Sequence, residues 1–207
     1  MKDLKFGIFD IFTYLIPGGV LVCSMLLLCS TNICEISKIS TLIGKPETAE
    51  SLIWVLVSYL FGIVCHAFGV RLFSFFKRFI WKIPPRNYKN YTNSQMFVLI
   101  RELSPANFTY VETWLALRGM SFNLAFSIGV LSLVFISKGV SLFTNCGFQF
   151  QWLLAALISI GFSIVFIYRA KKFNDWYHDD CISTIEMLHL EQKALNQAGN
   201  TSNSTEK

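Results

Sequence analysis

Charged residues and catalytic signatures are both scarce in this chain. Asp, Glu, Lys and Arg make up 15% of the 207 residues, whereas about a quarter is usual in a soluble domain. The sequence has no C-x-x-C pair, no Cys/His spacing typical of a zinc site, and no G-x-S-x-G, H-E-x-x-H or phosphate-loop motif. The composition excludes an ordinary soluble domain, and we expect a non-enzymatic protein without a metal or another cofactor.

The chain has instead four long apolar runs, and hydrophobic residues make up 53% of it. The runs lie at about 8–29, 52–73, 120–136 and 150–168. Each is close to the ~20 residues that a helix needs to cross a hydrocarbon core about 30 Å thick. We therefore predict an all-α polytopic membrane protein with four transmembrane helices. No A-x-A-like cleavage site follows the first run, so we expect that run to remain as a span.

Positive charge is distributed unequally between the two sides of these runs. If the N-terminus is cytosolic, only Lys38, Lys45 and Lys138 of the 18 Lys and Arg residues fall on the outer side. Cytosolic loops of membrane proteins carry an excess of Lys and Arg. The sequence therefore predicts a multi-pass protein of a cell membrane with both termini in the cytosol.

Helical periodicity continues beyond the apolar runs. We expect cytosolic helical segments at about 84–119 and 171–195, a single domain over 1–195, and a disordered polar tail over 196–207. Ser104 followed by Pro105 is typical of a helix start, and one helix should run from Pro105 to about Ser137. The apolar faces of these extensions either cover one another or bind a partner. They carry Phe108, Val111 and Trp114, and then Phe173, Trp176, Tyr177 and Ile185.

Pro17, followed by two glycines, stands in the middle of the first apolar run. Proline lacks a backbone N–H and its ring clashes with the preceding turn, so a helix kinks or stops there. We therefore expect the first span to be kinked or interrupted at Pro17.

Ionisable residues lie in the inner half of the predicted spans or at their cytosolic edge. Because charge is costly in hydrocarbon, such residues are candidates for function. Asp10 could pair with Arg71 or Arg118, and His66 could be a protonation switch. Alternatively, Asp10 marks a helix entry, the two arginines reach lipid phosphates, and His66 is hydrogen-bonded structurally.

Small residues recur at helical spacing on three of the predicted spans. Such stripes let helix backbones approach closely in a membrane. The sequence leaves open whether they form an oligomer interface or pack within one four-helix bundle; we expect a homo-oligomer. The residues are Ser58, Gly62, Cys65 and Gly69, then Ser121, Ala125 and Gly129, and finally Ala155, Ser159 and Ser163.

The segment 71–89 is rich in basic residues and contains no acidic one. A basic cluster beside a membrane attracts anionic lipid, and it could instead dock an acidic protein. We expect contact with membrane lipids, and we do not expect direct nucleic-acid binding. The candidate patch consists of Lys77, Arg78, Lys82, Arg86 and Lys89.

Two cysteines, Cys34 and Cys146, fall beyond the outer membrane face in this topology. In an oxidising compartment they could form a disulfide that ties the two outer loops together. Free thiols are the alternative, because the sequence alone does not fix a pairing.

Two short segments, Asp10–Gly18 and Glu112–Arg118, resemble segments common in bacterial families of unassigned function. Over the whole chain, the number of spans, the size and the charge layout resemble small four-span inner-membrane proteins of anti-phage defence modules, such as Kiwa membrane subunits. The resemblance implies an inner-membrane location and a role in antiviral defence.

Three functions are compatible with the sequence. The first is a non-enzymatic sensor or anchor that oligomerises and couples to a soluble cytosolic partner. The second is a pore-forming effector that depolarises the membrane, for which Asp10 and the helix-weakening Pro17 are the support. The third is a lipid-acting enzyme, although no paired acid and base stands out. We expect the first.

Overall fold

The computed structural model describes residues 11–30, 48–82, 88–89, 91–143 and 150–194, and within them the chain is helical and has no strand. Four stretches are long and apolar enough to cross a membrane, which confirms the predicted all-α polytopic layout. The elements are the π-helix η1 (Ile11–Leu15), α2 (Ile16–Cys29), α4 (Thr48–Phe75), the π-helix η3 (Phe76–Ile80), α5 (Asn93–Leu103), α6 (Pro105–Phe143) and α7 (Phe150–Met187).

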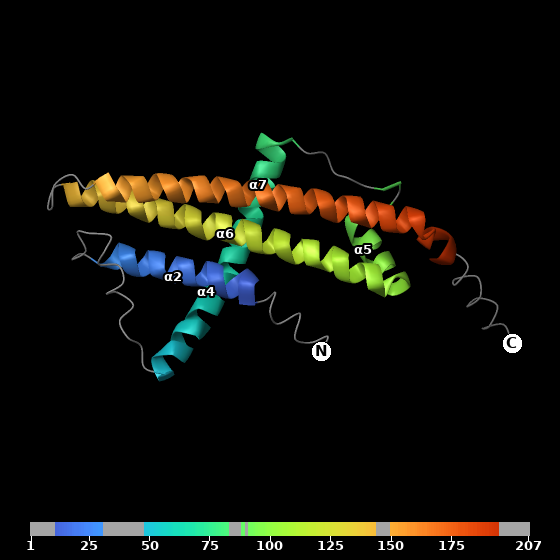
Figure 1. The fold of residues 1–207 in the computed structure, drawn as a ribbon, viewed down its shortest axis with the longest axis horizontal. Helices are drawn as coiled ribbons and strands as arrows, with labels where there is room; N and C mark the ends of the chain where they lie inside the picture. Colours follow the sequence, from blue (N-terminus) through green and yellow to red (C-terminus); the bar gives the residue numbers. More distant parts are fainter. Residues whose placement is uncertain (1–10, 31–47, 83–87, 90, 144–149, 195–207) are drawn as a thin grey trace.

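The long helices α6 and α7 lie side by side and antiparallel, and α2 lies along one half of α6 (Figure 1). The helix α4 crosses this set steeply instead of running alongside it (Figure 1). The helix α5 packs near the N-terminal end of α6 and the C-terminal end of α7 (Figure 1). The arrangement is thus three aligned helices with a fourth laid across them. The predicted bundle did not anticipate this crossing.

Both α6 and α7 are far longer than a membrane is thick. With 39 and 38 residues, they are about 58 and 57 Å long at a rise of about 1.5 Å per residue. A hydrocarbon core of about 30 Å accounts for roughly half of that length. Each helix therefore continues, without a break, well beyond its apolar part.

The observed helix ends differ from the expected ones in two places. The helix that begins at Pro105 continues to Phe143, beyond Ser137. The helix α7 ends at Met187 and is broken at 188–189, where His189 adopts a left-handed backbone conformation with φ of 47°; helical residues resume at 190–194, close to the expected end at 195. That turn directs Leu190 back into the interior, where it is fully buried.

The extensions form a small helical unit, which we call the distal unit: α5, residues 105–117 of α6 and residues 173–194 of the C-terminal region. A capping box starts α5, in which the Gln95 backbone N–H donates to Thr92 Oγ1 and the Thr92 N–H donates to Gln95 Oε1. The predicted apolar faces cover one another here. The shared core consists of Met96, Ile100, Val111, Tyr177, Cys181, Ile185 and Leu190.

The first span is not interrupted at Pro17. The backbone changes from the π-helix η1 to the α-helix α2 at Ile16, directly before the proline. The buried Pro17 lies at the first turn of α2, where a missing N–H is tolerated best.

Candidate functional site

The helices α2 and α4 touch backbone to backbone where they cross. A Cβ atom on Gly18 would overlap the Ser58 carbonyl, and a Cβ atom on Gly62 would overlap the Tyr14 carbonyl. Cys65 is buried at the same crossing, and its Sγ lies 3.8 Å from the Pro17 carbonyl oxygen. The small face of α4 therefore seats the η1–α2 segment of the same chain.

The other small residues also lie between helices of this chain. Ser163 Oγ of α7 donates a hydrogen bond of 2.7 Å to the carbonyl of Ala125 on α6. A Cβ atom on Gly129 would lie 3.4 Å from Ser163 Oγ, and Ser121 and Ser159 are buried. Gly69 of α4 packs on Phe122 and Asn123 of α6, and Ala155 is half-buried. The described contacts of these faces are intrachain packing, and the homo-oligomer stays a prediction.

A polar junction lies beside the crossing, around the fully buried side chain of Asn123. Asn123 Nδ2 donates a hydrogen bond of 2.9 Å to the Thr13 carbonyl oxygen. In an α-helix that carbonyl would accept from the N–H four residues later, which is position 17, and proline has none. Thr13 lies in the π-helix η1, so Asn123 gives its carbonyl a donor from α6 at a place where Pro17 rules out the α-helical one.

The same amide nitrogen also contacts His66. Asn123 Nδ2 lies 3.4 Å from His66 Nδ1 on α4, a long contact. Since the Thr13 carbonyl can only accept, the amide nitrogen must face it, and His66 Nδ1 is then an acceptor. Tyr14 and Phe122 pack around the His66 ring, with ring centroids at 5.6 and 5.3 Å.

Arg118 lies deeper in the fold than the other predicted arginine. Its Nη1 donates to Asn174 Oδ1 at 2.9 Å, and its guanidinium carbon lies 5.7 Å from the ring centroid of Tyr177. Asn174 and Tyr177 are both buried on α7. Arg118 thus ties α6 to α7 where the apolar parts of both helices give way to the distal unit.

The predicted ionisable residues are not gathered into one site within the part of the chain that the structure describes. Arg71 is exposed, with its guanidinium 5.8 Å from the centroid of Phe68. His66 contacts Asn123, and Arg118 contacts Asn174. Asp10 lies outside the described residues, so its predicted ion pair stays a prediction.

The predicted basic patch is divided between two places. Lys77 and Arg78 belong to η3, and Lys82 follows it. Lys89 Nζ instead forms an ion pair of 2.8 Å with Glu191 of the distal unit, and this hydrogen bond raises the pKa of Lys89 above its ordinary value. Arg86 lies outside the described residues.

Neither cysteine of the predicted disulfide, Cys34 or Cys146, lies in the described part of the chain. Four described cysteines, Cys23, Cys29, Cys65 and Cys181, are free thiols. In the same part of the chain, no group of three His, Cys, Asp or Glu side chains could hold a metal ion.

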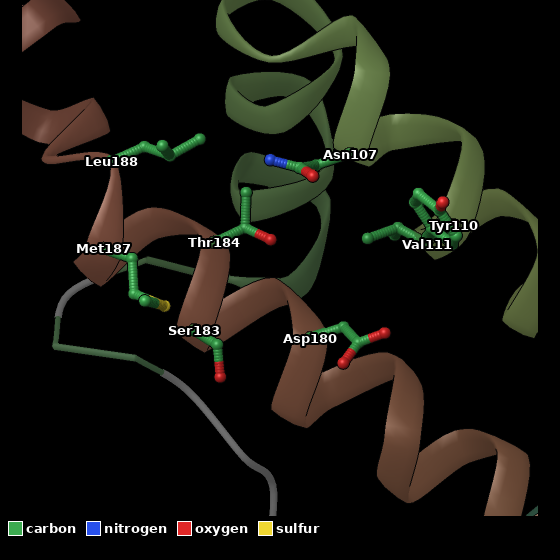
Figure 2. A pocket seen from close by; sticks show the side chains of 8 residues that line it. All are labelled: Asn107, Tyr110, Val111, Asp180, Ser183, Thr184, Met187 and Leu188. Atoms are coloured by element: carbon green, nitrogen blue, oxygen red, sulfur yellow. The ribbon is translucent and has the colours of Figure 1, made fainter.

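A shallow hollow of about 320 Å³ opens between α6 and α7 in the distal unit. Figure 2 shows Asn107 and Val111 of α6 facing Asp180 and Thr184 of α7 across it. Asp180 Oδ2 accepts a hydrogen bond of 2.6 Å from Trp114 Nε1, which fixes the carboxylate against α6. The other residues that line the hollow are Tyr110, Ser183, Met187 and Leu188.

The two helix segments that form this hollow carry acidic but no basic residues, and they expose large side chains. Tyr110 is 67% exposed and Met187 is 81% exposed, although both belong to the distal unit. Residues 105–117 and 173–187 contain no Lys or Arg. Their charged residues are Glu112, Asp175, Asp179, Asp180 and Glu186.

These features define a class: a helical polytopic protein whose last two membrane-length helices continue into a folded unit outside their apolar parts. Comparison with protein-family models, with curated proteins and with solved structures finds no match for the chain. The function must therefore be argued from the residues themselves.

Proposed function

We propose that this protein is a non-enzymatic inner-membrane anchor or sensor that couples to a soluble cytosolic partner through its distal unit. Both termini and the distal unit lie in the cytosol in this proposal, as the distribution of Lys and Arg favours. A role in anti-phage defence is proposed from the resemblance in span number, size and charge layout.

The observation that carries the proposal is the hollow between α6 and α7, which is lined by the carboxylate of Asp180 and by the exposed side chains of Tyr110 and Met187. Large exposed side chains such as Tyr110 and Met187 are typical contact residues of protein interfaces. Asp180, held by Trp114, and the exposed Glu186 add negative charge beside them. The surface therefore suits a partner segment that is basic and apolar.

Coupling to the membrane follows from helix continuity. The helices α6 and α7 each run unbroken from their apolar parts into the distal unit. Arg118 and Asn174 join them at the transition, and Trp114 joins Asp180 one step further out. A change in how the two helices pack in the membrane would therefore shift the two sides of the hollow.

The partner surface can be tested by site-specific photo-crosslinking in living cells. A photoreactive residue replaces Tyr110 or Met187 in one set of variants. Leu133 and Val140 are matched controls, because they are similarly exposed but lie on the apolar part of α6. We expect one adduct of discrete mass with a soluble protein at both distal positions and at neither control. The absence of distal adducts, or equal adducts at the controls, would contradict the proposal.

The cytosolic position of the distal unit has its own test. In a variant whose native cysteines are replaced, Met187→Cys provides a single exposed thiol. We expect a membrane-impermeant maleimide to label it only after the inner membrane is opened. Labelling in intact spheroplasts would reverse the topology.

Self-association is proposed on weaker grounds, because the crossing helix α4 exposes most of its apolar side chains. Lipid or a second copy would cover them equally well. Mass measurement of the protein in mild detergent distinguishes a closed oligomer from a monomer. No specific feature of the described residues favours a pore-forming effector or a lipid-acting enzyme.

A further inference from the structure

Exposed apolar side chains and exposed cations alternate where α4 passes into η3. Phe75, Phe79 and Ile80 are each more than half exposed, and Arg78 and Lys82 are exposed among them. Aromatic and apolar groups beside basic groups at one level are typical of a membrane interface. There the rings contact the lipid chains while the cations reach the headgroups.

This segment is held against α7 by Trp81. The Trp81 ring packs on Phe73 and Phe76, with centroid distances of 5.9 and 5.7 Å. On α7, Lys171 Nζ lies 5.9 Å from the centroid of the same indole ring. A cation from a distant part of the sequence is thus placed next to Trp81, whose chain neighbour is Lys82.

Other cations at this level also lie on aromatic rings. Arg169 lies over Phe173, with its guanidinium carbon 5.8 Å from the ring centroid. The ammonium of Lys172 lies 5.3 Å from a ring centroid of Trp176. Contacts of this kind orient a cation while leaving N–H groups able to donate.

Little negative charge offsets this group within the described residues. For Arg78, Lys82 and Lys171, the structure describes one ion pair, between Lys171 Nζ and Asp175 at 3.6 Å. Arg78 lies over the ring of Phe79 at 5.6 Å. Positive charge therefore gathers at the end of η3 without an equal number of acidic partners there.

We propose that Arg78, Lys82 and Lys171 form a binding site, the η3 lipid site, for the phosphate headgroup of an anionic phospholipid. The three cations donate to the phosphate, and the exposed side chains of Phe79 and Ile80 contact the start of the acyl chains. A phospholipid satisfies both halves of this surface at once. An acidic soluble protein would pair with the cations but would leave the neighbouring apolar side chains uncovered.

The site differs from the basic patch that the sequence suggests. Lys171 joins it from α7, because Trp81 packs between η3 and that helix. Lys89 does not belong to the η3 lipid site, because it is paired with Glu191 in the distal unit. This difference supplies a matched control.

The test is a lipid titration of the intact, delipidated protein in detergent, read by native mass spectrometry. We expect phosphatidylglycerol to bind more tightly than phosphatidylcholine. The double variant Arg78→Gln/Lys82→Gln should weaken phosphatidylglycerol binding by about 25-fold, at roughly fivefold per charge. Binding of phosphatidylcholine should not change.

The control is Lys89→Gln/Arg101→Gln, which changes the net charge equally but removes cations paired with Glu191 and Glu102. We expect less than a twofold effect. Equal weakening by both double variants would show that net charge alone attracts the lipid, and no weakening by either would also overturn the site.

Two further arms separate the source of the phosphate and the role of the indole. Glycerol 1-phosphate carries the same phosphate without acyl chains, and we expect it not to displace phosphatidylglycerol. Displacement by it at comparable concentration would make this a site for a free phosphate compound. Trp81→Leu keeps every cation, yet it should weaken phosphatidylglycerol binding because Lys171 loses its ring contact; unchanged binding would contradict the proposed geometry.

Discussion

The hydrogen bond from Asn123 to the Thr13 carbonyl can be tested by removing its donor. Asn123→Leu keeps most of the side-chain volume but has no N–H group, so the Thr13 carbonyl loses its donor from α6. An unsatisfied buried acceptor costs about 1–3 kcal/mol. Interhelical hydrogen bonds measured in a membrane protein average about 0.6 kcal/mol and reach about 1.7 kcal/mol. We therefore expect the free energy of unfolding to fall by about 1–2 kcal/mol.

A second substitution identifies the mechanism. Pro17→Ala restores a backbone N–H four residues after Thr13, so the turn that is now the π-helix η1 can become α-helical and satisfy the Thr13 carbonyl from its own span. In that background Asn123→Leu should cost about 0.5 kcal/mol or less, which gives a coupling energy near 1 kcal/mol between the two positions. The assay is reversible unfolding in mixed micelles, followed by circular dichroism, for the four proteins of the cycle.

The control for this cycle is Ser132→Ala. Ser132 is buried on α6, but its hydroxyl donates within its own helix, to the carbonyl of Gly129 at 2.7 Å. Its effect should add to that of Pro17→Ala without coupling. If Asn123→Leu costs the same in both backgrounds, Asn123 acts through packing or through His66, and the explanation based on Pro17 is wrong.

Two further predictions concern helix packing. Gly62→Val should sharply reduce the yield of monodisperse protein in size-exclusion chromatography, because any side chain there overlaps the Tyr14 carbonyl; Gly161→Val, where nothing lies within 4 Å, should not. Ile100→Ala should destabilise the distal unit by about 2–5 kcal/mol and speed its limited proteolysis, because the side chain is fully buried. Val98→Ala, at an exposed position on the same helix, should leave the proteolysis rate nearly unchanged, and equal rates for both variants would contradict the described core.

The four spans could be predicted because the bilayer sets both the length and the composition of a membrane helix. The unbroken helix from Pro105 could be predicted because Ser-Pro marks a start and no breaker follows. The end of α7 could not, since periodic apolar residues continue past it. The helix stops at Met187 because His189 takes a left-handed conformation, which no sequence pattern there indicates.

The polar junction was missed for a different reason. An ionisable residue such as His66 stands out in a membrane span because its charge is costly there, whereas the neutral amide of Asn123 does not. Pro17 gave a signal of its own, because it leaves one carbonyl without a donor. The sequence cannot show which helix supplies a hydrogen-bond donor at this place, since this depends on how α6 lies against η1. The same limit applies to Gly62, whose size predicts a close approach but does not identify Tyr14 as the contact.

Charge along the chain is similarly ambiguous until the helices are placed. Lys82 and Lys89 stand in one basic segment, yet one lies at the end of η3 and the other pairs with Glu191. Lys171, which the sequence assigns only to topology, lies beside Trp81. Distance along a sequence therefore does not measure the distance between charges when helices fold back on one another.

The positions of the charges bear on how the two proposed surfaces act together. Lys171 of the η3 lipid site and Asp180 at the hollow are nine positions apart on α7, which is about 13 Å along the helix. This exceeds the screening length of about 8 Å at physiological ionic strength. The cations of the η3 lipid site therefore act only weakly on a basic partner at Asp180. Asp175 is the exception among the acids of the distal unit, because it already pairs with Lys171 at 3.6 Å. Under the two proposals, one protein would hold lipid and partner simultaneously, with the α6–α7 pair as the physical connection between them.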